Sequence, residues 1–203
     1  MSIAVHQGDL PDNVVFTGAV AVDTETMGLN PKRDRLCVIQ LSSGDGTAHL
    51  VQFKAGEYNA PNLVKLLSDP DVTKIFHFAR FDVAVLYEYL GVMCQSVYCT
   101  KIASRLCRTY TDRHGLKDIC RELLGVQLDK HQQSSNWGAE TLSPEQQKYA
   151  AFDVLYLHKL KGKLDDMLQV NGRAPMAYEC FGFLPTRAQL DLAGWEECDI
   201  FHH

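Results

Sequence analysis

The sequence predicts one α/β domain with a mixed central sheet flanked by helices. Over the first two thirds of the chain, short β-type apolar runs alternate with helical patterns, and glycine or proline separates most of them. The chain has 203 residues, of which 46% are hydrophobic and 22% charged. This balance is typical of a globular protein, and the length suits one full-sized domain.

The predicted strands are the apolar runs at residues 14–16, 19–25, 35–41, 48–53 and 74–78. Gly44-Asp45-Gly46 separates the third run from the fourth, so these two runs are expected to form a hairpin. The strand at 19–25 runs into Gly28 and Asn30-Pro31, which must form a turn.

Helices are predicted over residues 61–67, 81–90, 101–108 and 116–124, with Gly91 and Gly125 as stop signals. The clearest helix begins after Ser143, because Pro144 suits a first turn and Gln146 completes a capping box. Its apolar residues recur until Asn171-Gly172. We divide the chain into a main unit at 1–172 and an extension at 173–203, which shows no clear period.

Composition excludes several classes of protein. No run approaches the roughly 20 apolar residues that cross a bilayer, and the N-terminus lacks a secretion signal. The seven cysteines are scattered without a CxxC pair, which favours free thiols in a reducing cytoplasm. The net charge of −5 favours a short nucleic acid over a long one, because long substrates usually require many basic contacts.

Asp23 and Glu25 lie two residues apart at the end of an apolar strand. Side chains alternate along a strand, so both carboxylates are expected on one face of the sheet. Alone, such a pair is more often two solvated acids at a strand end than a catalytic site.

The segment from His77 to Asp82 places an acid after a buried strand, where a helix begins. Asp82 could serve only the helix dipole, and His77 could be a core histidine. The third element is Tyr149 and Asp153, four apart on the clearest helix and therefore on one face. An aspartate on an otherwise apolar face is costly unless it is paired or binds a metal.

Together the four acids suit phosphodiester hydrolysis. Two Mg²⁺ or Mn²⁺ ions about 3.5–4 Å apart can activate water and stabilise the leaving oxygen, and carboxylates are the ligands they prefer. A tyrosine one turn before the last acid can orient the attacking water.

These three segments resemble the motifs of the DEDD superfamily of 3′→5′ exonucleases, in the branch with a tyrosine in the third motif. The resemblance covers about residues 10–170 and implies an RNase H-like, DnaQ-like exonuclease fold with two metal ions per site. It implies that Asp23 bridges both ions, that Glu25 and Asp153 complete one ion site, and that Asp82 holds the second ion. Tyr149 would position the water.

Within this branch the chain resembles RNase D, through Leu128-Asp129-Lys130 and Ser135-Asn136-Trp137, although Asn136 replaces the usual aspartate. The resemblance implies that Lys130 contacts a phosphate; the alternative is an ordered polar loop. By similarity to oligoribonuclease, Leu29 would wedge between two bases, or else pack as a turn leucine. The remaining residues expected to contact substrate are Thr24, Met27, His77 and Ser135.

The tail from Leu184 to Ala188 and from Asp191 to Trp195 resembles the bacterial nano-RNase C group. That resemblance implies degradation of very short single-stranded RNA or DNA, including dinucleotides, by a ring of eight subunits. Aromatic residues of the tail would form the interface between subunits. Alternatively, the tail folds back over its own domain.

Three other functions remain open at this stage. The chain could trim the 3′ ends of structured RNA as RNase D does, although the accessory helical domains of long RNase D proteins are not expected here. It could also be a metal-free nucleic-acid-binding module, or a structural oligomer whose acids bind stray cations.

Overall fold

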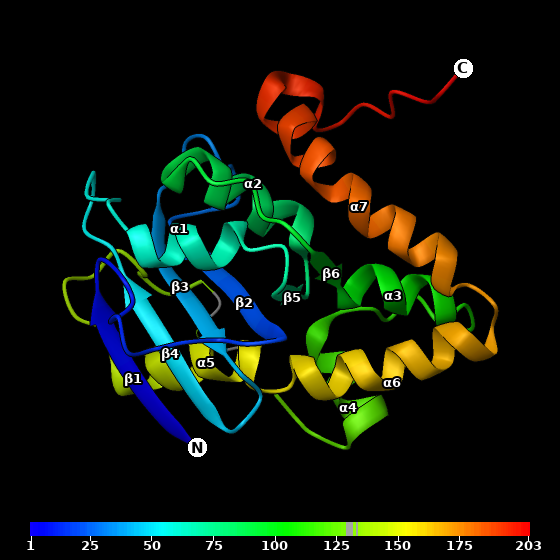
Figure 1. Ribbon diagram of the computed structural model, residues 1–203, viewed down its shortest axis with the longest axis horizontal. Helices are drawn as coiled ribbons and strands as arrows, with labels where there is room; N and C mark the ends of the chain where they lie inside the picture. The colour runs from blue at the N-terminus through cyan, green and yellow to red at the C-terminus, as the bar shows by residue number, and fades with distance from the viewer. Residues whose placement is uncertain (129–131, 133) are drawn as a thin grey trace.

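A six-stranded mixed sheet forms the centre of the molecule (Figure 1). The computed structural model describes residues 1–128, 132 and 134–203. The strand order is β1-β4-β3-β2-β5-β6. The pair β2–β3 and the pair β3–β4 are antiparallel, and the other three pairs are parallel. The strands are β1 (Ser2–Gln7), β2 (Ala19–Thr26), β3 (Leu36–Ser42), β4 (Thr47–Gln52), β5 (Thr73–Phe76) and β6 (Val97–Cys99).

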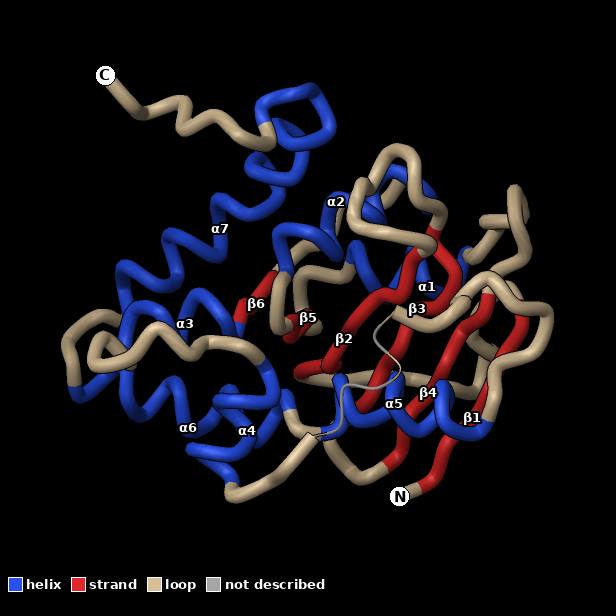
Figure 2. Tube along the Cα trace, turned by 180° about the vertical axis from the view of Figure 1, so that it is seen from behind, coloured by secondary structure: helices blue, strands red, loops and turns tan. Residues whose placement is uncertain are grey.

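Helices flank the sheet, with α1 and α2 on one side and α5 on the other (Figure 1). Seen from behind, α3, α4 and α6 gather beyond the β6 edge of the sheet, and α7 rises beside them (Figure 2). The helices are α1 (Pro61–Ser68), α2 (Ala79–Leu90), α3 (Thr100–Cys107), α4 (Leu116–Leu124), α5 (Pro144–Leu155), α6 (Leu157–Val170) and α7 (Ala174–Leu190). A π-helical turn, η1 (Asp191–Trp195), follows α7. None of these helices is long and apolar enough to span a lipid bilayer.

The α/β class and the hairpin between β3 and β4 are confirmed. The two glycine stop signals are also confirmed, since Gly91 and Gly125 adopt left-handed conformations with φ of 66° and 69° that suit a residue without a side chain.

Near the N-terminus one strand prediction was wrong and one strand was missed. Residues 14–16 form a loop and do not pair in the sheet. Phe16 is nevertheless buried, because its ring packs edge-on against His49. The edge strand Ser2–Gln7 was not predicted, and it pairs in parallel with β4. A short apolar run therefore did not distinguish a loop that covers the sheet from a strand within it.

The single helix predicted from Ser143 to Asn171 is two helices that meet at Tyr156. The break is needed because α5 packs on the sheet, whereas α6 leaves it to pack against α3 and α4. The predicted capping box is present: Gln146 N donates to Ser143 Oγ at 3.2 Å, and Ser143 N donates to Gln146 Oε1 at 2.9 Å.

The tail is more regular than the sequence indicated, because most of it forms α7. Its inner face is buried against α2, α3 and β6, where Phe181 packs on Tyr98 with ring centroids 4.6 Å apart. Its outer face leaves Tyr178 54% and Trp195 47% exposed. The aromatic residues of the tail are thus divided between the core of this domain and its surface.

Candidate active site

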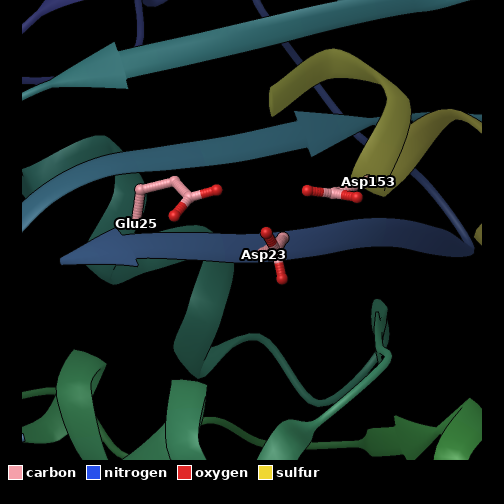
Figure 3. Close-up of side chains that lie close together, drawn as sticks. All are labelled: Asp23, Glu25 and Asp153. Atoms are coloured by element: carbon pink, nitrogen blue, oxygen red, sulfur yellow. The ribbon is translucent and has the colours of Figure 1, made fainter. Parts of the chain in front are cut away.

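Three carboxylates meet where α5 crosses β2. Asp23 and Glu25 come from β2, and Asp153 comes from α5. One ligand oxygen from each lies within 4.8 Å of the others (Figure 3). The alternation along β2 places Asp23 and Glu25 on one face of the sheet, and a register shift between Glu25 and Thr26 ends the regular pairing with β3.

The fourth carboxylate approaches from the other side of β2. Asp82 lies in the first turn of α2 and is only 3% exposed. Thr24 stands between Asp23 and Glu25 on the strand, so its side chain points to the opposite face, where Thr24 Oγ1 donates to Asp82 Oδ1 at 2.7 Å. The strand that supplies two acids therefore also orients a third through the intervening threonine.

The carboxylates of the cluster repel one another when they are ionised. Burial raises the pKa of Asp23 well above its ordinary value, and the charges of the neighbouring carboxylates raise it further. Glu25 has a raised pKa for the same two reasons. Burial raises the pKa of Asp82 to about 7, although the hydrogen bond from Thr24 opposes this shift. Closely spaced oxygens that repel one another suit a hard divalent cation, because its positive charge would attract all of them.

The carboxylates line a cleft of about 660 Å³. Its volume is in the range of sites for small ligands, so the cleft holds only a few nucleotides of a chain. Of the residues predicted to contact substrate, Thr24, Met27, Leu29, His77 and Ser135 line this cleft. Lys130 lies outside the described residues, so its prediction stays untested.

Leu29 projects from a tightly held turn at the rim of the cleft and is 87% exposed. A Cβ at Gly28 would lie 2.3 Å from Asp34 Oδ2, so a larger residue there would displace the Asp34 side chain. Asp34 also accepts a hydrogen bond from Asn30 N at 3.0 Å. The turn therefore presents an apolar side chain to the cleft.

Tyr149 lies one helical turn before Asp153 and also lines the cleft. Its ring packs on the buried Trp137 with centroids 5.9 Å apart, and its hydroxyl hydrogen-bonds to Asp153. Burial and the nearby carboxylates raise the pKa of Tyr149, so its hydroxyl is protonated at neutral pH.

The start of α5 fixes one wall of the cleft. Gln146, the capping-box residue, also donates from Nε2 to Ser135 Oγ at 3.0 Å and to the carbonyl oxygen of Asn136 at 3.1 Å. The same side chain thus begins the helix that carries Asp153 and holds the segment that carries Ser135.

Several cleft residues had no signal in the sequence. Phe78 is half exposed, and the ammonium of Lys101 lies 4.2 Å from the centroid of its ring. Lys117 lines the cleft at the start of α4. Phe78 lies within the segment from His77 to Asp82 but was assigned no role, and the two lysines belong to none of the three motif segments, so only the folded chain brings these side chains together at the cleft.

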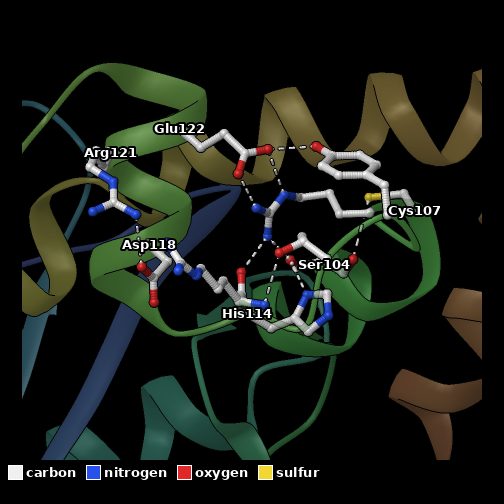
Figure 4. A network of polar contacts seen from close by, with 10 residues as sticks. Ser104, Cys107, His114, Asp118, Arg121 and Glu122 are labelled. Atoms are coloured by element: carbon white, nitrogen blue, oxygen red, sulfur yellow. Dashed lines mark hydrogen bonds and ion pairs between the residues drawn. The ribbon is translucent and has the colours of Figure 1, made fainter.

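A second polar cluster holds the loop between α3 and α4. Arg108 is fully buried and forms an ion pair with Glu122, while its guanidinium also donates to Ser104 Oγ at 2.9 Å and to the carbonyl oxygen of Arg113 at 2.8 Å (Figure 4). These contacts tie α3, the following loop and α4 together. The loop leads directly to Gly115, which lines the cleft.

A protein family described as 3′-5′ exonuclease matches residues 10–169. The chain belongs to this family. It is therefore a nuclease, and the matched range contains all four carboxylates and Tyr149. The expectation of a metal-free binding module or a purely structural oligomer is not supported by this membership.

Two groups of relatives are similar to the chain. A structure of NrnC from Brucella melitensis is 62% identical, with a TM-score of 0.96 and full coverage of both chains. Further structures of that protein are described with bound Mg²⁺ and bound to pGG. Ribonuclease D from Granulibacter bethesdensis is 32% identical over 76% of this chain. The chain spans about two fifths of the length of that relative, 38%.

Proposed function

We propose that the chain hydrolyses short single-stranded oligonucleotides from the 3′ end, dinucleotides included, and releases nucleoside 5′-monophosphates with the help of two Mg²⁺ or Mn²⁺ ions. The observation that carries this proposal is the set of four carboxylates that line one cleft of about 660 Å³: three partly exposed ones within 4.8 Å of one another, and the buried Asp82 held by Thr24. Similarity over full length to the Brucella protein described with Mg²⁺ and with pGG supports it.

In this proposal the four carboxylates hold the metal ions, which supply an activated water and neutralise charge that develops on the phosphate. Asp23 would contribute to both ion sites, and Glu25 with Asp153 would complete the site of the ion that activates water. Asp82 holds the second ion from the α2 side of the strand.

The remaining residues position the substrate. The Tyr149 hydroxyl orients the attacking water, and its ring is held for this purpose by Trp137. Leu29 separates the bases at the rim, and Met27, His77 and Ser135 line the path of the oligonucleotide. The side chain of Thr24 is used to orient Asp82, so its contact with substrate would be made by the backbone.

A length series tests the proposal. Unlabelled RNA and DNA oligonucleotides of two to about twenty residues are incubated with Mg²⁺ or with EDTA, and the products are separated by chromatography. We expect mononucleotides from every short substrate, faster turnover of the shortest ones, and no release in EDTA. The Asp153→Asn variant serves as the control for contaminating nucleases. Release of internal fragments, or release that persists in EDTA, would contradict the proposal.

The same series addresses trimming of structured RNA 3′ ends, the activity suggested by the RNase D relatives. That activity predicts efficient turnover of long RNA with a folded 5′ portion and poor turnover of dinucleotides. The short cleft favours the first proposal.

We also propose that the chain assembles into a closed ring, for which eight subunits is the expected number. Residues 1–172 would form the catalytic unit, and 173–203 an extension that adds an interface. The support is the exposed outer face of the tail, where Tyr178, Trp195 and Phe201 lie on the surface. Cytoplasmic location is part of this proposal, because five free cysteines are buried as thiols.

Light scattering tests the assembly. Removal of α7 would expose the core beneath Phe181, so point substitutions are the better variants. We expect the unchanged chain to be oligomeric and the Tyr178→Ser, Trp195→Ser double variant to dissociate. A monodisperse monomer for the unchanged chain would refute the ring.

A further inference from the structure

A fully buried glutamine lies beside the acidic cluster, on the neighbouring strand of the sheet. Gln40 belongs to β3 and stands directly opposite Asp23 of β2 in the antiparallel register. Opposite side chains of an antiparallel pair point to the same face, with Cβ atoms about 4.5–5.5 Å apart. Gln40 therefore lies on the face that carries Asp23 and Glu25, within reach of the carboxylate that would contribute to both ion sites.

Helix α5 covers the part of the sheet in which Gln40 lies. Leu50 of β4 is opposite Gln40 on its other side, and Val38 precedes it by two residues, so the three side chains share one face. Leu50 and Val38 pack with Ala150 of α5 in one buried cluster. A row of side chains thus crosses the sheet from the apolar Leu50 through Gln40 to Asp23.

The side-chain amide of Gln40 has no hydrogen-bond partner within the part of the chain that the structure describes. Both Oε1 and Nε2 are buried and unpaired. By contrast, the buried Gln52 donates from Nε2 to the carbonyl oxygen of Ala139 at 2.8 Å and accepts from Gln7 Nε2 at 3.1 Å. Gln146 is likewise bonded at both atoms.

An unpartnered amide is a costly core residue. A buried donor or acceptor without a partner costs free energy, whereas an apolar side chain of similar shape at the same position would not. Packing against Leu50 and Ala150 therefore does not explain why position 40 carries a glutamine. A group that the amide could bond is the neighbouring carboxylate.

Asp23 has few donors for a carboxylate that is expected to be ionised beside a cation. It receives a backbone hydrogen bond from Thr24 and otherwise faces the charges of three other carboxylates. Carboxylates that bind metal ions are usually held by hydrogen bonds from groups behind them, which fix the direction of the ligand oxygens. Gln40 is placed to supply such a bond.

We propose that Gln40 is a positioning residue of the metal site, and that its amide nitrogen donates to the Asp23 carboxylate when this carboxylate holds a cation. The inference rests on the proposed function, whose metal site it concerns. The last torsion of a glutamine side chain has a broad minimum, so the amide can turn toward Asp23. Gln40 then determines how firmly Asp23 is directed at the ions, without touching either the ions or the substrate.

Two matched substitutions on the same face of the sheet test this role. Gln40→Met removes the unpartnered amide and keeps an unbranched side chain, and Gln52→Met makes the same change on β4, where the amide is bonded. Mn²⁺ alone is titrated into each variant by isothermal titration calorimetry, without substrate. We expect Gln40→Met to weaken Mn²⁺ binding by about tenfold or more, and Gln52→Met to leave it unchanged.

The melting temperature in EDTA separates positioning from structure. Gln40→Met should keep or raise it, because no hydrogen bond is lost. Gln52→Met should lower it by about 2–5 °C, because the carbonyl oxygen of Ala139 loses its donor. If Gln40→Met lowered the melting temperature as much as Gln52→Met does, the amide would be part of the fold and the proposal would be overturned.

Kinetics with a dinucleotide give a second readout. Gln40→Met should raise the Mg²⁺ concentration for half-maximal rate by about tenfold, while KM for the dinucleotide at saturating Mg²⁺ stays within about twofold. A merely structural residue would change neither value in this selective way. An unchanged Mg²⁺ requirement would contradict the role of Gln40.

The titration with Mn²⁺ also separates this proposal from the proposed function. Weaker Mn²⁺ binding by Gln40→Met would support the role of Gln40 even if no oligonucleotide were hydrolysed. Hydrolysis by the unchanged chain, with a Mn²⁺ affinity that Gln40→Met does not alter, would overturn the role of Gln40 alone. Absence of Mn²⁺ binding by the unchanged chain would overturn both proposals.

Discussion

The acidic cluster at the cleft and the cluster around Arg108 are two polar sites that differ in their balance of charge. The first gathers carboxylates, and the second pairs a cation with an acid. At the cleft, every charged group that raises the pKa of Asp23 is another carboxylate. In the second cluster, the guanidinium of Arg108 pairs with Glu122 and donates to the hydroxyl of Ser104 and the backbone carbonyl of Arg113. In the second cluster a cation meets its acceptors, whereas the carboxylates of the first add like charge to one another. Taking charged groups out of water costs free energy at both sites. At the cleft these groups serve binding, and around Arg108 they serve structure.

The largest effect is expected from breaking the acidic cluster. Asp153→Asn should lower kcat by at least about 100-fold, because a lost ligand weakens charge stabilisation at the nucleophile and the leaving group. Asp23→Asn, Glu25→Gln and Asp82→Asn should do the same. Steady-state assays with saturating Mg²⁺ measure the effect, and near-normal rates for Asp153→Asn would show that the third motif is assigned wrongly.

Breaking the arginine cluster should instead affect stability. Arg108→Met leaves the carbonyl of Arg113 and the hydroxyl of Ser104 without their donor, so we expect a loss of about 2 kcal/mol in the free energy of unfolding. The matched variant Glu122→Gln should cost less than about 1 kcal/mol, because Glu122 is partly solvated. Urea unfolding measures both. Equal losses would mean that charge pairing, and not donor geometry, holds this cluster.

Tyr149 belongs to the acidic cluster by position and carries no charge at neutral pH. Tyr149→Phe should lower kcat about tenfold with little change in KM, because orientation of water matters mainly in the transition state. The melting temperature should stay within about 2 °C, since the ring still packs on Trp137. An unchanged kcat would make Tyr149 a packing residue only.

The smallest expected effect concerns pH and metal removal. Asp23, Glu25 and Asp82 have pKa values raised above those of the unfolded chain, so the metal-free fold binds more protons and loses stability as pH rises through those values. In EDTA, the melting temperature should be about 2–4 °C lower at pH 8 than at pH 6.

Saturating Mg²⁺ should remove this pH difference, because the cations compensate the ionised carboxylates. Asp23→Asn should raise the melting temperature in EDTA at pH 8 and reduce the stabilisation by Mg²⁺. Differential scanning fluorimetry measures these shifts. If Asp23→Asn did not raise the melting temperature in EDTA at pH 8, the carboxylates of the cluster would not be repelling one another.

The sequence predicted the acidic cluster well because its determinants are local. The two-residue spacing of Asp23 and Glu25 and the four-residue spacing of Tyr149 and Asp153 each place side chains on one face. The capping box at Ser143 also determines where α5 begins. The roles of these residues remain predictions, although the structure brings the side chains together.

The rest of the site could not be predicted because it depends on contacts distant in sequence. Nothing near Thr24 indicates that it orients Asp82, which lies 58 residues away. Arg108 has no local pattern that marks it as fully buried. The break at Tyr156 follows from where α5 and α6 pack, and the helical tail was obscured because Pro185 lies inside α7.

The tie between Arg80 and Asp191 has a consequence for reading genetic screens. Arg80 lies two residues before Asp82, and it joins that turn of α2 to η1 near the end of the chain. Loss of the arginine would break its tie to Asp191, 111 residues further along the chain, and would loosen a proposed metal ligand. A screen scored on activity alone would group variants of Arg80 with variants of the proposed metal ligands. If the variants were sorted by both activity and melting temperature, Arg80 would group with the residues that hold α2 to the C-terminal region.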